Sequence, residues 1–289
     1  MATDPDPRAA PLTIDDHRRD RAGLTYVYPV VSRRAGGVSI GVNLNPNHAC
    51  NWRCIYCQVP GLVRGTAPPI DLAVLERELQ GLLDDVLRGD YLATHVPPEA
   101  RRVNDIALSG DGEPTSAREF ERVVELIGRV RVRVPVPSGV KTVLITNGSL
   151  MQRPEVQAGL RTLATLEGEV WFKVDRATAA GIQAVNDVAL SPDAVRRNLA
   201  TAARLCPTWV QTCVFALDGA PPSDAEVDAY VALLRASLVD GVPLRGVFLY
   251  GLARPPLQPE GPRLSNVPAL WMDALAARVR SLGLAVTVT

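Results

Sequence analysis

The sequence has no excess of charge of either sign and no long apolar run. Lysine plus arginine and aspartate plus glutamate each number 31 among 289 residues, so the formal net charge is zero. This balance gives no bulk indication of a nucleic-acid partner, although it leaves room for a local basic face. No stretch approaches the ~20 apolar residues of a membrane span, and the polar first residues contain no apolar signal core. We therefore expect a cytoplasmic protein with no membrane partner.

Cysteine is scarce, and the five cysteines are unevenly spread. Three of them, Cys50, Cys54 and Cys57, follow the spacing C-x3-C-x2-C. The odd total disfavours a disulfide framework and fits a reducing compartment. Three thiolates this close can bind one metal centre, and a cubane iron–sulfur cluster usually has four cysteine ligands, so three would leave one iron open. His48 extends the pattern to H-x-C-x3-C-x2-C, which makes a closed structural zinc site the competing interpretation.

The remaining sequence alternates strand patterns with helix patterns, without an internal repeat or a low-complexity tract. Apolar residues in alternating or continuous runs predict strands over 24–31, 38–44, 103–108, 141–146, 170–174, 209–217, 244–249 and 284–289. Apolar residues three and four apart predict helices over 71–88, 117–131, 155–164, 178–188, 192–205, 223–238 and 267–282. Such a series implies an α/β fold with a parallel sheet covered by helices.

The number of strand–helix units falls short of the eight of a closed barrel. Because parallel crossovers are right-handed, the units wind one way. We therefore expect a partial, open barrel of the (β/α)6 type over residues 31–289. An N-terminal arm rich in Asp, Pro and Arg is expected over residues 1–30. Functional sites in such folds lie at the carboxyl ends of the strands.

Polar residues follow the expected strands at those ends. The second strand of the series runs into Ser109-Gly110-Asp111-Gly112-Glu113-Pro114, where glycines allow the backbone to approach a ligand and two carboxylates lie beside them. A plain turn is the structural alternative. Asn147 ends the third strand. Lys173 and Asp175 lie two residues apart on the fourth, so both are expected to point into the barrel mouth, as a catalytic pair or a structural ion pair.

The last strands carry four further candidates. Gln211 and Cys213 lie on the fifth strand, and Cys213 is interpreted either as a hydrogen-atom donor or as a packed core thiol. Tyr250 and Arg254 follow the sixth strand. An arginine at a barrel mouth would bind a carboxylate, and a solvated loop arginine is the alternative.

These features resemble the radical S-adenosylmethionine (SAM) superfamily. Tyr56 supplies the aromatic residue of that superfamily's C-x3-C-x-aromatic-C motif, and the run 109–115 is similar to its GGE segment, with Asp111 where the first glycine often stands. A more specific resemblance, to the branch of wyosine-synthesising-like iron–sulfur oxidoreductases, rests on the cysteine loop with Gln58 and on Ser32-Arg33-Arg34, Gly41-Val42-Asn43, Thr146-Asn147-Gly148-Ser149, Gln211-Thr212 and Tyr250 to Pro256.

The resemblance implies a single [4Fe-4S] cluster, ligated by Cys50, Cys54 and Cys57, with SAM bound to the remaining iron. Cleavage of SAM then gives a 5′-deoxyadenosyl radical that abstracts hydrogen from an unidentified substrate. It assigns the SAM contacts to the backbone of Tyr56, to Gly110, Asp111, Gly112 and Glu113 for the ammonium group, and to Asn147, Asp175 and Gln211 for the ribose and carboxylate. The candidates that remain for orienting the substrate are Lys173, Tyr250 and Arg254.

A small-molecule or peptide substrate is favoured over tRNA. Wyosine-type enzymes modify a guanosine of tRNA and carry a second cluster on additional cysteines, whereas only Cys206 and Cys213 remain in this chain. A lysine forms a Schiff base in that tRNA enzyme, and Lys173 is the candidate counterpart here. Modification of tRNA stays open as the alternative enzyme, and a non-catalytic zinc or iron–sulfur module stays open outside the enzymes. The implied reductant is a flavodoxin or ferredoxin.

Overall fold

A curved, mostly parallel sheet forms the centre of the molecule. The computed structural model describes residues 12–13, 22–32 and 36–289. Its main sheet has the order β1 (Val27–Ser32), β2 (Gly37–Val42), β5 (Val103–Leu108), β6 (Lys141–Thr146), β7 (Gly168–Lys173), β8 (Thr208–Cys213), β10 (Leu244–Tyr250), β12 (Val286–Val288). All neighbouring pairs are parallel except β1 and β2. Because the order runs from β1 to β12 without returning, the sheet is an open barrel, as predicted.

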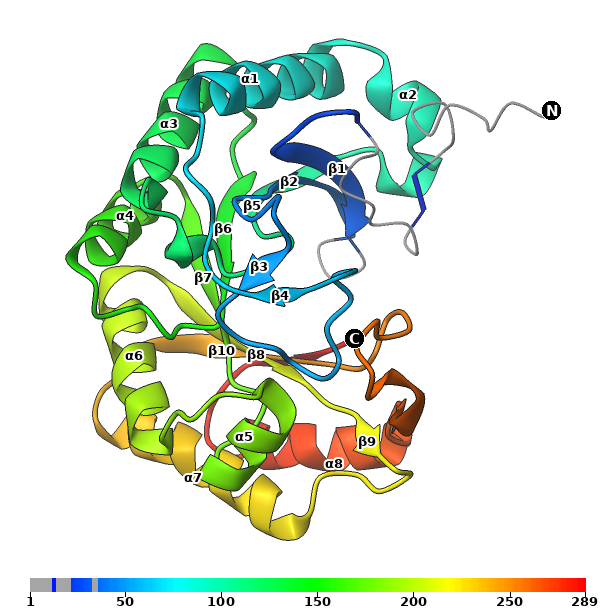
Figure 1. The fold of residues 1–289 in the computed structure, drawn as a ribbon, viewed down its shortest axis with the longest axis vertical. Helices are drawn as coiled ribbons and strands as arrows, with labels where there is room; N and C mark the ends of the chain where they lie inside the picture. Colours follow the sequence, from blue (N-terminus) through cyan, green and yellow to red (C-terminus); the bar gives the residue numbers. More distant parts are fainter. Residues whose placement is uncertain (1–11, 14–21, 33–35) are drawn as a thin grey trace, which may run out of the picture.

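The helices lie outside the sheet, in an arc that Figure 1 shows from α1 to α8. They are α1 (Leu72–Arg88), α2 (Tyr91–His95), α3 (Phe120–Arg133), α4 (Pro154–Ala164), α5 (Ala179–Asn186), α6 (Pro192–Leu205), α7 (Asp224–Val239) and α8 (Ala269–Arg280). Short 3-10 turns cover Pro98–Ala100, Pro114–Ser116 and Gly261–Arg263. Each predicted helix is present, and its boundaries agree to within a few residues.

Helix α1 shows how the sequence specifies these elements. Leu75, Leu79 and Leu83 recur along one face and are completely buried against the sheet. The side chain of Asp71 caps the first turn by accepting hydrogen bonds from the backbone N–H groups of Ala73 and Val74. In the same way, the side chain of Ser223 caps α7 by accepting a hydrogen bond from the backbone N–H of Glu226.

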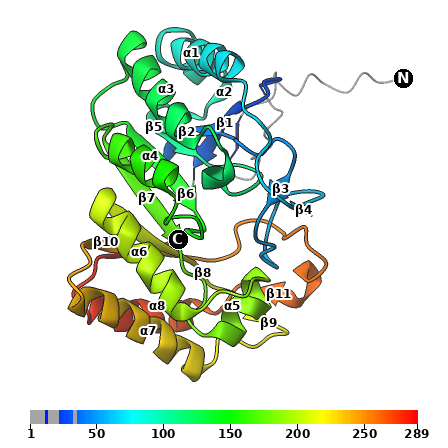
Figure 2. The same ribbon diagram turned by 60° about the vertical axis from the view of Figure 1, so that its left-hand side comes forward.

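Two small sheets at the mouth were not predicted. Strands β3 (Ala49–Cys50) and β4 (Val63–Arg64) pair in parallel and bracket the cysteine loop. Strand β9 (Ala216–Leu217) pairs with β11 (Leu264–Ser265). The predicted strand 209–217 was therefore too long, because β8 ends at Cys213 and the residues beyond the edge of the main sheet pair with β11 instead. Figure 2 shows β3 and β4 on the opposite side of the sheet from α3 and α4.

The amino-terminal end joins the barrel earlier than predicted. Strand β1 pairs with β2 from Val27 to Ser32, so it crosses the expected boundary between the arm and the domain. Leu12 is also completely buried. Most of the expected arm, and Arg33-Arg34 of the sequence motif, lie outside the described residues. Within the described part of the chain, none of the helices combines the length and the apolar character needed to cross a lipid bilayer.

Candidate functional site

The cysteine loop and several of the predicted strand-end residues line one cavity. The cavity has a volume of about 270 Å³ and lies at the carboxyl ends of β5, β6 and β7. The predicted residues in its wall are Cys50, Cys54, Tyr56, Cys57, Gly110, Asp111, Gly112, Glu113, Asn147, Lys173 and Arg254. The structure thus brings together residues separated by up to two hundred positions in the chain, as the strand-end rule for parallel barrels predicts.

Hydrogen bonds fix the shape of the cysteine loop. The backbone N–H of Cys57 donates to the carbonyl of Cys54 at 2.9 Å, which closes a tight turn between the two thiols. The backbone N–H of Trp52 lies 3.5 Å from Cys50 Sγ. All three thiols are free and only partly exposed. All three cysteines of the loop line the same cavity.

Burial weakens the acidity of two thiols of this loop, those of Cys50 and Cys54. It raises the pKa of Cys50 to about 11 and that of Cys54 to about 12. Both groups are therefore protonated at neutral pH in the metal-free protein. Since a metal binds the thiolate, assembly of any metal centre here would release protons.

The carboxyl end of α5 holds the loop from below. Backbone N–H groups of Arg53 and Ile55 donate to the carbonyls of Asn186 and Val185 at 3.2 and 2.9 Å. The last carbonyls of a helix have no partner within the helix, and the loop supplies one. The side-chain amide of Asn186 also donates to Cys54 Sγ at 3.3 Å.

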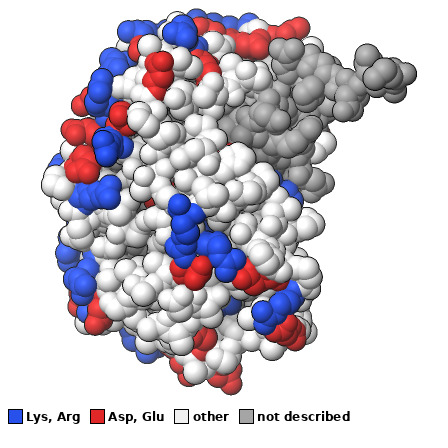
Figure 3. Space-filling view, in the orientation of Figure 1, with Lys and Arg blue, Asp and Glu red and all other residues white. Residues whose placement is uncertain are grey.

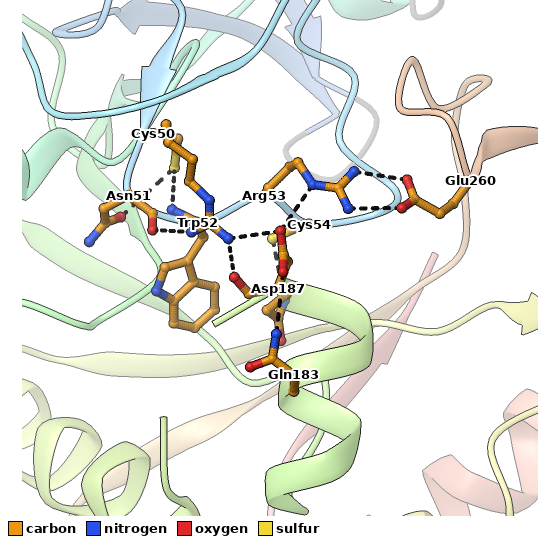
Figure 4. Close-up of polar contacts among 10 residues, drawn as sticks. Cys50, Asn51, Trp52, Arg53, Cys54, Gln183, Asp187 and Glu260 are labelled. Carbon is orange, nitrogen blue, oxygen red and sulfur yellow. Dashed lines mark hydrogen bonds and ion pairs between the residues drawn. The ribbon is translucent and has the colours of Figure 1, made fainter. Parts of the chain in front are cut away.

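Ion pairs anchor the same loop on its outer side. Figure 4 shows the guanidinium of Arg53 between Asp187 and Glu260. Its Nε lies 3.0 Å from Asp187, and Nη2 lies 2.8 Å from Glu260, which it binds through two nitrogen atoms. Arg64 pairs with Asp187 at 2.9 Å. Hydrogen bonds from Arg53 hold the pKa of both carboxyl groups below the usual range.

The glycines of the segment after β5 are required by close packing on the start of the cysteine loop. A Cβ atom at Gly112 would lie 2.2 Å from the carbonyl oxygen of Ala49, and one at Gly110 would lie 2.2 Å from Asn43 Oδ1. Asp111 is fixed by the same asparagine, which donates to its carboxylate at 2.7 Å. The segment therefore lies directly against the loop that carries Cys50.

Glu113 is held by the protein on both carboxylate oxygens. Oε1 accepts from the backbone N–H and hydroxyl of Thr115 and from the hydroxyl of Thr146, and Oε2 accepts from the backbone N–H of Asn147. Burial raises its pKa, and these hydrogen bonds act in the opposite direction. The sequence predicted that this acid binds a ligand ammonium. Glu113 lies in the cavity wall, and its observed contacts tie the end of β5 to the end of β6.

Lys173 and Asp175 are joined through Tyr56. The Lys173 ammonium donates to the Tyr56 hydroxyl at 2.7 Å, and that hydroxyl donates to Asp175 Oδ2 at 2.6 Å. Burial lowers the pKa of Lys173, but the nearby Tyr250, Asp175 and thiol groups outweigh it and raise the pKa well above the usual value. Lys173 is therefore a cation at neutral pH, in the wall of the cavity.

Asp175 differs from the prediction that it points into the mouth. Strand β7 ends at Lys173, so the alternation of sides no longer applies two residues later. Its carboxylate instead lies behind Tyr56, where it accepts from Tyr56, from Asn186 at 2.8 Å and from the backbone N–H of Cys213 at 3.1 Å. Lys173 and Asp175 are therefore linked through the hydroxyl of Tyr56 in one hydrogen-bonded network, and they do not both point into the cavity.

Of the remaining predicted residues, Arg254 is in the cavity wall, whereas Gln211, Tyr250 and Cys213 are not among the described residues that line it. Gln211 is 1% exposed and lies in β8 in register with Lys173. Tyr250 packs against a small apolar cluster that includes Tyr56, Cys213 and Phe215. Cys213 is therefore a packed core thiol in this structure. Arg254 reaches the cavity wall, and its carbonyl accepts a hydrogen bond from Gln58 at 2.8 Å.

His48 is directed away from the three cysteines. Its Nδ1 lies 2.8 Å from the carbonyl of Pro60, and Nε2 lies 3.9 Å from Asp111. Over the ranges that the structure describes, no three or more histidine, cysteine, aspartate or glutamate side chains converge in a way that could hold a metal ion. In a cubane cluster, each cysteine binds a different iron, so the sulfur atoms surround the cluster instead of meeting at one point.

Sequence reasoning missed Asn51, Asn186, Asp187 and Glu260. Asn51 lies inside the cysteine motif, where its side chain accepts from Asn147 Nδ2 and donates to Ser149, both at 2.8 Å. Its position in the motif was a usable signal. The other three lie 123 or more positions from the loop residues that they bind, and the sequence contains no pattern that connects them.

The face around the site carries charges of both signs. In Figure 3, basic and acidic side chains stand side by side on the face shown. The two arginines of the cysteine loop, Arg53 and Arg64, are each paired with an acid. This pattern is consistent with the zero net charge of the sequence.

Comparison with known proteins finds relatives that match this chain over only part of their length. No protein-family model matches the chain. The chain is 28% identical over 175 residues to a UPF0026 protein of Helicobacter pylori strain J99, which covers 56% of this chain and 50% of the relative. It is 33% identical over 138 residues to a UPF0026 protein of Helicobacter pylori strain 26695, and this match covers 46% of this chain and 38% of the relative. The chain thus spans half or less of the length of these curated relatives.

Solved structures share the fold at low sequence identity. TYW1 with a lysine–pyruvate adduct bound has a TM-score of 0.53 and 14% identity, and the match covers 86% of this chain and 73% of that one. Streptococcus suis SuiB bound to S-adenosylmethionine has a TM-score of 0.55 and 10% identity. That match covers 88% of this chain and 47% of the SuiB chain. A radical SAM methyltransferase from Sphaerobacter thermophilus has a TM-score of 0.52 and 14% identity. That match covers 91% of this chain and 68% of the methyltransferase chain. The chain has the partial-barrel fold of the radical SAM enzymes, which confirms the predicted resemblance at the level of the fold.

Proposed function

We propose that this protein is a radical SAM enzyme. Cys50, Cys54 and Cys57 would ligate three irons of a [4Fe-4S] cluster, and S-adenosylmethionine would bind the fourth. The observation that carries the proposal is that these three thiols and the segment 110–113 line one cavity at the mouth of a radical SAM-type barrel. When bound, the reduced cluster and SAM supply a 5′-deoxyadenosyl radical that abstracts hydrogen from a substrate.

The donor set of the cavity fits an iron–sulfur cluster. Soft thiolates select iron–sulfur clusters, zinc and copper(I) over hard cations. The amide of Asn186 and the backbone N–H of Trp52 are aimed at two of the sulfurs, and N–H donors of this kind stabilise sulfur that carries negative charge. His48, the fourth ligand that a closed zinc site would need, has its ring nitrogens directed toward Pro60 and Asp111.

The residues around the cluster would divide into SAM contacts and supports. Gly110, Asp111 and Gly112 present main chain to the cavity beside Asn147 and would contact the ammonium and ribose of SAM. Glu113 would act by fixing that main chain, since its carboxylate is engaged by Thr115, Thr146 and Asn147. In the same way, Asp175 would fix the ring of Tyr56 at the cavity wall.

The opposite side of the cavity would orient the substrate. Lys173 and Arg254 place two cationic groups in its wall, and cations of this kind bind carboxylate or phosphate groups. Tyr250 packs against the apolar cluster that includes Tyr56. The task of these side chains is to hold one substrate C–H bond near the SAM carbon and to exclude water.

For partners, we favour a small molecule or a peptide as substrate, with a flavodoxin or ferredoxin as reductant. Binding of tRNA depends mainly on phosphate contacts from basic residues, and the basic residues of the cysteine loop are already paired with acids. A wyosine-type reaction on tRNA is the second candidate. Its supporting observation is that Lys173 lies in the cavity wall of a barrel similar to that of TYW1.

The test is SAM cleavage by reconstituted protein. The protein is loaded anaerobically with iron and sulfide, reduced, given SAM and assayed for 5′-deoxyadenosine. We expect product from wild type and from Cys206→Ala, whose thiol is buried against the carbonyl of Gly168 at the far end of the strands. We expect none from Cys54→Ala. Equal product from Cys54→Ala, or a wild-type protein that takes up one zinc and no cluster, would contradict the proposal.

A further inference from the structure

The side-chain amide of Asn186 connects helix α5 to a cysteine sulfur. Asn186 is the last residue of α5 and is 1% exposed. Its Nδ2 lies 3.3 Å from Cys54 Sγ and 2.8 Å from Asp175 Oδ2. An amide nitrogen carries two hydrogens, so it can donate to both acceptors at once. Cys54 lies in the loop 132 positions away in the chain.

The surrounding groups determine which way this amide faces. Asp175 is itself fixed, because its carboxylate accepts from the hydroxyl of Tyr56 and from the backbone N–H of Cys213. Turning the amide by 180° would place its oxygen against the carboxylate of Asp175, with two acceptors in contact. The network therefore assigns the amino group, and not the oxygen, to the sulfur of Cys54.

The backbone of the same residue holds the neighbouring main chain. The carbonyl of Asn186 accepts from the backbone N–H of Arg53, and the carbonyl of Val185 accepts from that of Ile55. Cys54 is thus held on both sides by main-chain bonds and at its sulfur by a side-chain bond, all from the end of one helix. This arrangement leaves the sulfur little freedom to move.

We propose that Asn186 is a positioning residue that sets the reduction potential of the cluster, an inference that rests on the proposed function above. Reduction adds negative charge that is shared by the cluster and its cysteine sulfurs. An N–H group that donates to a sulfur stabilises this charge and raises the reduction potential. The same bond restrains Cys54, so its removal also weakens retention of iron.

The test replaces Asn186 by leucine, which has a similar size and no hydrogen-bond donor. A second variant replaces it by alanine, which has the highest helix propensity. Each protein is reconstituted, and the midpoint potential of its assembled cluster is measured by redox titration followed by EPR. Release of iron to a chelator is timed in parallel. The matched control is Asn198→Leu in α6, which removes another buried amide, one that accepts a hydrogen bond from Gln152.

We expect a more negative midpoint potential and iron release about tenfold faster or more in both Asn186 variants, with wild-type values in the control. If the leucine variant does not fold, the alanine variant decides. An unchanged or more positive potential in an Asn186 variant that carries an intact cluster would overturn the inference. Absence of a cluster in wild type would instead overturn the proposed function, so the two failures are distinguishable.

Discussion

Gly112 packs directly on the carbonyl group of Ala49, the residue before the first cysteine of the loop. A Cβ atom at Gly112 would lie 2.2 Å from that oxygen, closer than any real contact of this kind. The segment that follows β5 and the cysteine loop are therefore fitted to each other with no room for a side chain. Residues of both segments line the proposed cofactor cavity, so this contact helps to shape it.

Gly112→Ala should displace the cysteine loop. Backbone atoms must move to admit the new methyl group, and overpacking of this kind costs about 1–3 kcal/mol. We expect lower stability of the metal-free protein in urea and less iron bound after reconstitution. The control is Gly81→Ala in α1, where the added Cβ meets no atom within 4 Å and alanine favours the helix. Equal iron content in the two variants would show that this contact does not shape the site.

Tyr56→Phe should destabilise the protein through Lys173. The phenol hydroxyl accepts from the Lys173 ammonium and donates to Asp175, and its removal leaves a half-buried cation without this hydrogen-bond acceptor. We expect a loss of about 1–3 kcal/mol in the free energy of unfolding. Because the lost stability arises from the Lys173 cation that has no acceptor, adding Lys173→Met should recover part of the free energy of unfolding. Additive losses in this double-mutant cycle would contradict the coupling.

Glu260→Gln should lower stability at neutral pH and have little effect in acid. Arg53 lowers the native pKa of Glu260, so the ion pair contributes stability above the ordinary pKa of about 4.3 and loses it as the pH falls through the lower native value. The partly exposed pair is worth about 1 kcal/mol or less. Thermal unfolding of metal-free wild type and variant from pH 7 to pH 3 measures the difference. A difference that grows in acid would have the wrong sign.

Local patterns were sufficient to predict most of the fold. The apolar spacing that predicted a helix over 71–88 is a signal within one element, and the structure confirms it with the buried leucines of α1. The series of such units fixes an open parallel barrel, because handed crossovers allow few other arrangements. The strand-end rule then placed the loop of Cys50 beside Gly112 and Asn147.

Side-chain partners were harder to predict because they depend on how separate elements end. Asp175 was expected to face the mouth by strand alternation, but β7 stops at Lys173 and the chain turns its carboxylate behind Tyr56. Sequence patterns did not predict that Glu113 accepts four hydrogen bonds from neighbouring turns. Asn186 reaches Cys54 only because the end of α5 lies beneath the loop.

The measurement that tests the account most directly is the EPR spectrum of the reduced, reconstituted protein with and without SAM. If Cys50, Cys54 and Cys57 hold three irons and leave the fourth open, SAM should bind that iron and change the signal. The account predicts a clear change at saturating SAM. A cluster signal that is identical with and without SAM would contradict the central claim and would indicate an iron–sulfur module that does not use SAM.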